Sequence, residues 1–82
     1  MIKLKALFEA KTAQRLYESG LSANQMLTEK PEGKVLLEAT VRDDVQLRWW
    51  LKGFGDKVEV VGPNHLREEF VEMAQKLVRL YP

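Results

Sequence analysis

The feature that most constrains this chain is the order in which its hydrophobic spacing changes. In some segments apolar residues recur at every second position, as in strands with one buried face. In other segments they recur at every third or fourth position, as in helices that bury one side. Along the chain these patterns predict strand, helix, strand, strand, helix, strand and helix. A chain with this order of elements has few topologies open to it.

Four segments show the two-residue spacing of strands. The first is residues 2–8, where lysines separate the apolar positions, and the clearest is residues 34–42. Residues 24–29 and 58–60 predict two shorter strands. A turn at residues 30–33, which contains Pro and Gly, separates two of these strands and predicts an antiparallel hairpin.

Three segments show helical spacing. Residues 10–19 predict a first helix that ends at Gly20 in a left-handed conformation. Its predicted apolar stripe is Ala10, Ala13, Leu16 and Tyr17. The second helix follows the capping pair Asp43-Asp44 and ends at Gly53 and Gly55, with the stripe Leu47, Trp50, Leu51 and Phe54.

The third helix, over residues 64–81, is the longest that the pattern predicts. Its stripe is Leu66, Phe70, Met73, Leu77 and Leu80. Val71, Ala74 and Val78 widen this apolar arc beyond what one packing face requires. Glu68, Glu69 and Glu72 come early in this helix and Lys76 and Arg79 come late, an order that complements the helix dipole, and Glu72 with Lys76 forms an i,i+4 pair.

These elements predict an α+β domain of the ferredoxin-like βαββαβ type with an additional C-terminal helix. The expected sheet is four-stranded and antiparallel, with two helices on one face and Lys3, Lys5 and Glu38 on the solvated face. The predicted core is Leu4, Phe8, Leu16, Leu37, Val41, Trp50, Leu51, Phe54, Val60, Leu66 and Phe70.

Composition narrows the class of protein. The chain has 82 residues, which fits a single domain over residues 1–82, and a net charge of +1, which argues against a domain that grips phosphates by itself. It has no cysteine, as is common in a reducing cytoplasm, and no apolar run long enough to cross a membrane. The first strand begins without a signal peptide. We therefore expect a cytoplasmic fragment, the C-terminal part of a longer protein.

No set of residues predicts catalysis. His65 is the only histidine and has no cysteine partner, so we expect an exposed residue in the first turn of its helix. Ser19 and Ser22 lie in a turn without a neighbouring base. We expect no enzyme activity, no catalytic residue, no metal site and no cofactor.

Trp49 is the most informative candidate for contact with a partner. It lies almost opposite the apolar stripe of its helix, with Val45 and Lys52 nearby. An exposed aromatic side chain beside an aliphatic one is typical of a partner surface. With Val71 and Val78 of the last helix, these residues are the predicted interface.

Several of these segments together resemble a known family. They are residues 47–55 (LRWWLKGFG), residues 58–63 (VEVVGP), residues 66–69 (LREE), the pair Asn24-Gln25 and the late Tyr81. This ordered set resembles the C-terminal extension (WCX) domain of bacterial WYL-domain transcriptional regulators. Trp50 matches the tryptophan of the family, whereas Trp49 departs from the pattern.

The resemblance implies a partner set and a function. Such regulators carry a winged-helix DNA-binding domain and a WYL domain ahead of the extension, which supports effector sensing and homodimer assembly. Single-stranded nucleic acid is the effector in some members, and no membrane is involved. The positions expected to contact nucleic acid or effector are Arg48, Arg67, Lys3, Lys5 and Arg42.

Two alternatives remain open from the residues. A small-molecule-binding regulatory domain of the same topology would be favoured by a pocket near Gly20-Leu21 or Gly55. An RNA-binding domain would need aromatic side chains on the open face of the first and third strands. That face is predicted to carry Lys3, Lys5, Leu7, Leu36, Glu38, Thr40 and Arg42, which makes RNA binding the weaker alternative.

Overall fold

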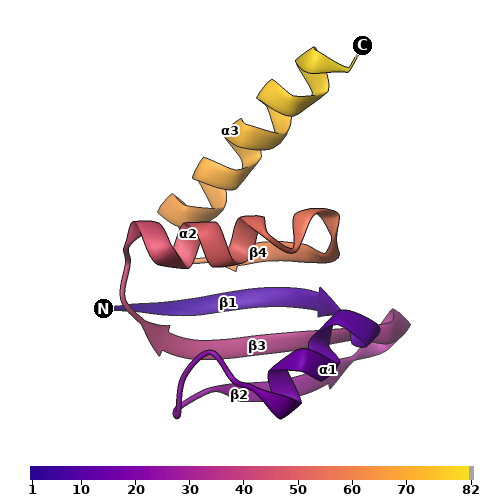
Figure 1. The fold of residues 1–82 in the computed structure, drawn as a ribbon, viewed down its shortest axis with the longest axis vertical. Helices are drawn as coiled ribbons and strands as arrows, with labels where there is room; N and C mark the ends of the chain where they lie inside the picture. Colours follow the sequence, from indigo (N-terminus) through magenta and orange to yellow (C-terminus); the bar gives the residue numbers. More distant parts are fainter. Residues whose placement is uncertain (82) are drawn as a thin grey trace.

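The computed structural model describes residues 1–81, and these form a four-stranded antiparallel sheet of order β2-β3-β1-β4 (Figure 1). The strands are β1 (Ile2–Glu9), β2 (Met26–Lys30), β3 (Lys34–Val41) and β4 (Val58–Gly62). The helices are α1 (Ala10–Glu18), α2 (Val45–Lys52) and α3 (Asn64–Leu80), with short 3-10 turns η1 (Pro31–Gly33) and η2 (Gly55–Lys57). The predicted α+β, ferredoxin-like architecture with an additional C-terminal helix is confirmed.

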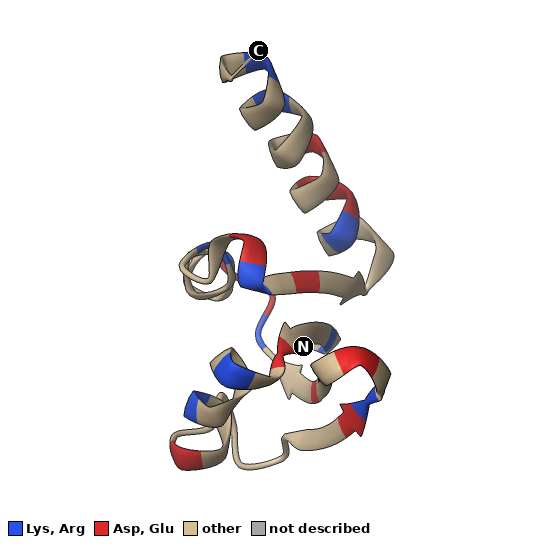
Figure 2. Ribbon diagram, turned by 90° about the vertical axis from the view of Figure 1, so that its right-hand side faces the viewer, with Lys and Arg blue, Asp and Glu red and all other residues tan. Residues whose placement is uncertain are grey.

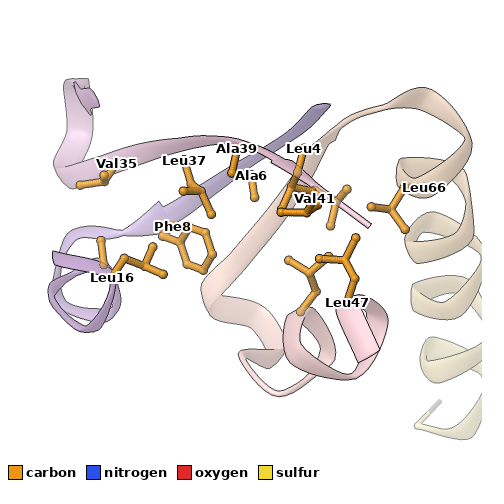
Figure 3. Packing of buried hydrophobic residues seen from close by; sticks show 13 residues of the cluster. Leu4, Ala6, Phe8, Leu16, Val35, Leu37, Ala39, Val41, Leu47 and Leu66 are labelled. Carbon is orange, nitrogen blue, oxygen red and sulfur yellow. The ribbon is translucent and has the colours of Figure 1, made fainter. Parts of the chain in front are cut away.

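The core lies between one face of the sheet and the helices α1 and α2 (Figure 3). Strand β1 pairs with β3 so that Leu4 lies opposite Ala39 and Lys5 opposite Glu38. Alternate residues therefore separate cleanly, with Leu4 fully buried and Lys5 exposed. The buried core is Leu4, Ala6, Phe8, Ala13, Leu16, Val35, Leu37, Ala39, Val41, Leu47, Leu51, Val60 and Leu66.

Three residues of the predicted core, Trp50, Phe54 and Phe70, are only partly buried. Trp50 and Phe54 make edge-to-face contacts with each other and with the buried Phe8, at ring-centroid distances of 4.9 to 6.1 Å. Such contacts stabilise aromatic pairs beyond simple burial. Trp50 and Phe54 therefore lie at the edge of the core, where each ring is partly packed against it and partly exposed to solvent.

The connection from α1 to β2 corrects two predictions. Ala10 and Tyr17 of the predicted stripe are exposed, because α1 turns only Ala13 and Leu16 onto the sheet. Gly20 is not left-handed, since the chain leaves α1 through an extended Ser19. A side chain at Gly20 would instead collide with the Gln25 amide, whose atoms lie 2.8–2.9 Å from an ideal Cβ position.

The Asn24-Gln25 pair is a structural device at this connection. The Gln25 amide accepts a hydrogen bond from the Leu21 N–H and donates one to the Leu16 carbonyl, both at 2.8 Å. The Asn24 side chain bonds the backbone N–H and carbonyl of Thr40 in β3, at 3.0 and 3.3 Å. β2 was predicted to begin at Asn24 but begins at Met26. At Asn24 the side-chain amide makes the hydrogen bonds to β3 that the backbone of a strand would otherwise make.

Helix α3 differs most from its prediction. It packs on β4 at its start and then projects away from the sheet (Figure 2). Leu66 is buried and Phe70 and Met73 are partly buried, but Leu77 and Leu80 of the same predicted stripe are 47% and 70% exposed. At 1.5 Å per residue a helix of 17 residues is about 25 Å long, and the sheet edge supports only its first turns.

Candidate functional site

Arg48 joins the start of α3 to the start of α2. Its guanidinium donates to both carboxylate oxygens of Glu69, from Nε at 2.8 Å and from Nη2 at 2.7 Å. Its Nη1 donates to Asp43 Oδ1 at 2.6 Å and to the Asp44 carbonyl at 2.9 Å. The paired geometry with Glu69 is the fork arrangement that gives arginine–carboxylate contacts direction as well as strength. We call Arg48, Asp43, Glu69 and His65 the basal clamp.

Opposite charges in the basal clamp shift the pKa values of its members. Hydrogen bonds from Arg48, and next from His65, lower the pKa of Asp43. The hydrogen bonds from Arg48 lower the pKa of Glu69. The bonds to Glu69 and then Asp43 raise the pKa of Arg48. These shifts mean that folding favours the ionised forms of Asp43, Arg48 and Glu69.

His65 lies in the first turn of α3 and its side chain is 53% exposed, which agrees with its predicted placement. Its Nε2 lies 2.8 Å from Asp43 Oδ2. Within residues 1–81 no group of three or more metal-ligating side chains converges. The contact of His65 is therefore a further link between α3 and the segment that precedes α2.

Arg67 forms a second link, between α3 and β4. Its Nη1 donates to Glu59 Oε2 at 2.8 Å and to the Val60 carbonyl at 2.9 Å. Arg48 and Arg67 were both predicted to contact nucleic acid or effector. In the structure their guanidinium groups are already bound to carboxylates, so an incoming phosphate would have to compete with those partners.

Beyond these links, an apolar groove separates α3 from β4 and η2. Its cavity volume is about 540 Å³, and its floor is formed by Val58, Val60, Phe70, Met73 and Leu77. Lys52, Asp56 and Glu59 lie at the groove as well. A groove of this size and composition is suited to an apolar ligand or an apolar side chain of a partner.

A second hollow on α3 adjoins this groove, because Val71 and Ala74 line both. Val71, Ala74, Gln75, Val78 and Arg79 border one surface hollow. Five of the eleven exposed large hydrophobic side chains within residues 1–81 lie between Val71 and Tyr81. We call the exposed residues from Val71 to Tyr81 the distal surface. An apolar concentration of this kind on a small domain usually marks a contact site.

The predicted interface residues do not form a single surface. Trp49 is 69% exposed and borders a hollow beside Arg15 and Leu16 of α1, whereas Lys52 lies at the groove beside α3. Val45 is exposed at the start of α2. Trp49 and Val78 therefore belong to different parts of the molecule, whereas Lys52 of α2 and Val71 of α3 line the same groove.

The remaining predicted contact residues lie apart from both surfaces. Lys3 and Lys5 are exposed on the open face of β1, opposite Thr40 and Glu38. Arg42 was predicted to lie on the open face of β3, but β3 ends at Val41 and Arg42 is exposed just beyond it. That prediction is therefore wrong. None of these three cations lines the groove or the hollow on α3.

Sequence reasoning missed Glu69 and Asp43 as partners of Arg48. Glu69 is 21 residues away from Arg48, and no local pattern links the two positions. Ala74 was predicted only as one of three residues that widen the apolar arc of this helix.

Two further observations bear on the class of protein. Within the part of the chain that the structure describes, no helix has both the length and the apolar character needed to cross a bilayer. Comparison with curated proteins found no match. The model of one protein family, the WCX domain, matches residues 1–78, which is nearly the entire chain. The chain therefore belongs to the WCX domain family.

Proposed function

We propose that this chain is the non-catalytic C-terminal regulatory and dimerisation module of a bacterial WYL-domain, winged-helix transcriptional regulator. In this role it supports effector sensing by the parent protein in the cytoplasm. Family membership supports a domain associated with regulators. The WYL and winged-helix domains, the homodimer and the effector are parts of the proposal.

The observation that carries the proposal is the distal surface of α3. Val78, Leu80 and Tyr81 are 69%, 70% and 78% exposed, a costly arrangement for a helix that ends in water. A domain that meets other domains or a second copy would cover this surface. The apolar contact then stabilises the assembly, whereas the isolated domain gains nothing from these side chains.

The arrangement of polar groups supports a binding role over catalysis. The strongest charged cluster, the basal clamp, is satisfied internally by mutual hydrogen bonds. A catalytic acid or base would need an unengaged side chain facing a cavity. The groove beside α3 is instead lined mainly by aliphatic and aromatic residues.

The parent reading frame provides the first test. We expect segments that encode a winged helix and a WYL domain upstream of residue 1. The regulator is then compared with a variant that lacks residues 1–82, using fluorescence anisotropy of operator DNA with and without short single-stranded DNA. Loss of the effector response with retained operator binding supports the proposal. An unchanged response, or a frame without those segments, contradicts it.

Trp49 offers a test of contact between domains. The chain has two tryptophans, so Trp50→Phe leaves Trp49 as the only reporter in the isolated domain. In the intact regulator, the Trp49 signal is the difference between the Trp50→Phe protein and the protein that carries both Trp49→Phe and Trp50→Phe. Acrylamide should quench Trp49 strongly in the isolated domain, where it is 69% exposed, and weakly in the intact regulator. Trp49→Phe is the matched control, because partly buried Trp50 should change little between the two. Equal quenching of Trp49 in both would show that no partner covers it.

A small-molecule-binding regulatory domain is the second candidate function. The groove at Gly55, with its volume of about 540 Å³, is the observation that favours it. A panel of small apolar ligands is screened by their effect on the melting temperature of the chain. A true groove ligand should lose its effect in Met73→Trp, which fills the groove, and keep it in Tyr17→Trp, which alters exposed α1. Equal effects in both variants would count against the groove.

A further inference from the structure

One side of α3 has a regular and mainly apolar face, which adjoins the groove beside β4 at Val71 and Ala74. Val71, Ala74, Gln75 and Val78 recur at i, i+3, i+4 and i+7, so they share one side of the helix. With Arg79 they border a single hollow in which the small Ala74 lies between two valines. A hollow at a small residue, between ridges of larger ones, is the shape into which a second helix packs.

Charges flank this face in a definite order. Glu68 and Arg79 are eleven residues apart, which is about three full turns, so they lie on the same flank of the apolar face. Along α3, Glu68, Glu69 and Glu72 lie in the half near the sheet beside the β4-bound Arg67, and Lys76 and Arg79 lie nearer the C-terminal end (Figure 2). Within residues 1–81, neither Glu68 nor Arg79 forms an ion pair.

Ala74 is close to the midpoint of both patterns. Glu68 lies six residues before it and Arg79 five residues after it, while Val71 and Val78 lie three before and four after. A two-fold axis through this position reverses the helix direction and keeps each flank on its own side. It places Glu68 opposite Arg79 of a second copy, and Val71 opposite Val78 of that copy.

We propose that α3 pairs in an antiparallel manner with α3 of a second copy of this chain, about a two-fold axis near Ala74. The inference rests on the dimer role in the proposed function and identifies the surface that forms the dimer. Charge complementarity favours a second copy of this chain as the partner. The Glu68 of each copy meets the Arg79 of the other, so the two-fold axis gives two such ion pairs. A parallel pair would leave each Glu68 about three helical turns away from the Arg79 of the other copy, so neither contact would form.

Cross-linking provides the first test, because the chain has no native cysteine. Ala74→Cys places a thiol near the axis, where the two copies come within reach of a disulfide. Mild oxidation should give covalent dimer at least about ten times faster than in Gln14→Cys, a matched exposed position on α1. The difference should vanish in denaturant. Equal rates under native conditions would overturn the α3 pairing.

Charge reversal provides the second test, by sedimentation equilibrium of the full 82-residue chain. Glu68→Arg and Arg79→Glu should each raise the dimer Kd roughly tenfold, because each creates two like-charge contacts. The double variant should restore the wild-type Kd to within about threefold. Val78→Glu should abolish the dimer, and Tyr17→Glu on α1 should leave it unchanged.

The outcomes separate this inference from the function on which it rests. A dimer whose Kd is unchanged in all α3 variants would overturn the antiparallel pair. The chain would then still be a dimerisation module, but its dimer would form through another surface. A chain that stays monomeric up to about 1 mM would also overturn it, since a contact weaker than about 4 kcal/mol gives no specific pair. The regulator role would then still be tested by its effector response.

Discussion

The two halves of α3 have the same kind of sequence and different surroundings. In the half near the sheet, Leu66 is fully buried (Figure 3). Arg67 and Glu69 are hydrogen-bonded to β4 and α2. In the far half, Val78 and Leu80 are about 70% exposed. The apolar spacing continues without change from one half to the other. The difference shows what amphipathic spacing can predict. The spacing indicates that a helix needs a partner surface, but it does not indicate whether that surface belongs to the same chain.

The comparison also assigns separate roles to the two halves. The anchored half fixes the direction in which α3 leaves the sheet, through the basal clamp and the Arg67 link. The far half then holds its apolar residues outside the core at a defined place. A rigid base with an exposed apolar end is the arrangement expected of a contact element.

Among the substitutions that test the contrast between the two halves, Leu66→Ala should lower the free energy of unfolding the most. Removing this buried side chain leaves a cavity where α3 meets the core and should lower the free energy of unfolding by about 2–5 kcal/mol. A domain of this size has only about 3–5 kcal/mol in total, so much of the protein should unfold. Urea denaturation followed by circular dichroism measures the loss. A loss below about 1 kcal/mol would mean that Leu66 does not anchor the helix.

Arg48→Met should have the next largest effect. The variant keeps the length of the side chain and removes its hydrogen bonds to Glu69, Asp43 and the Asp44 carbonyl. We expect a smaller loss of stability than for Leu66→Ala, because the clamp is partly open to solvent. Hydrogen exchange of the first turns of α3 should also become faster. Unchanged exchange there would show that the clamp does not hold α3.

Acid should remove the contribution of the clamp. Arg48 lowers the pKa of Asp43 and of Glu69 below their ordinary values of 3.8 and 4.5. A carboxyl group whose pKa is lowered by folding stabilises the fold above its ordinary pKa and loses that effect as the pH falls through the folded value. The stability difference between wild type and Arg48→Met should therefore be constant above about pH 5 and shrink below pH 4.

The acid experiment needs one control, because His65 also contacts Asp43. Both proteins are compared in a His65→Asn background, which removes the titration of the imidazole. Urea denaturation at a series of pH values gives the difference directly. A difference that stays the same down to pH 3 would show that the carboxylates of the clamp are not coupled to Arg48.

Leu80→Ala should have the smallest effect and is the matched partner of Leu66→Ala. The same side chain is removed from the same helix, but here it is 70% exposed. At a concentration where the chain is monomeric, we expect a change in stability within about 0.5 kcal/mol. A loss comparable to that of Leu66→Ala would show that the far half packs on its own domain, and the contrast between the halves would fail.

Much of the fold follows from local pattern. The alternation of Leu4 and Lys5 gives the buried face of β1, Asp44 caps α2 by accepting from the Leu47 N–H at 2.9 Å, and Glu72 pairs with Lys76 at 3.4 Å as predicted. Other features depend on distant segments. The Gln25 contact that explains Gly20 and the Arg48–Glu69 pair join positions that no periodicity relates.

The sequence alone determined which side chains face away from water within each element, because a strand or a helix fixes the direction of successive side chains by its own geometry. It therefore determined the order of elements, the sheet and the family. Tertiary structure decided how far the sheet reaches along α3, and so which apolar residues of that helix are covered. That outcome depends on the angle between α3 and β4, which is set by contacts such as Arg67 with the Val60 carbonyl and Arg48 with Glu69. Such contacts exist only once the chain has folded.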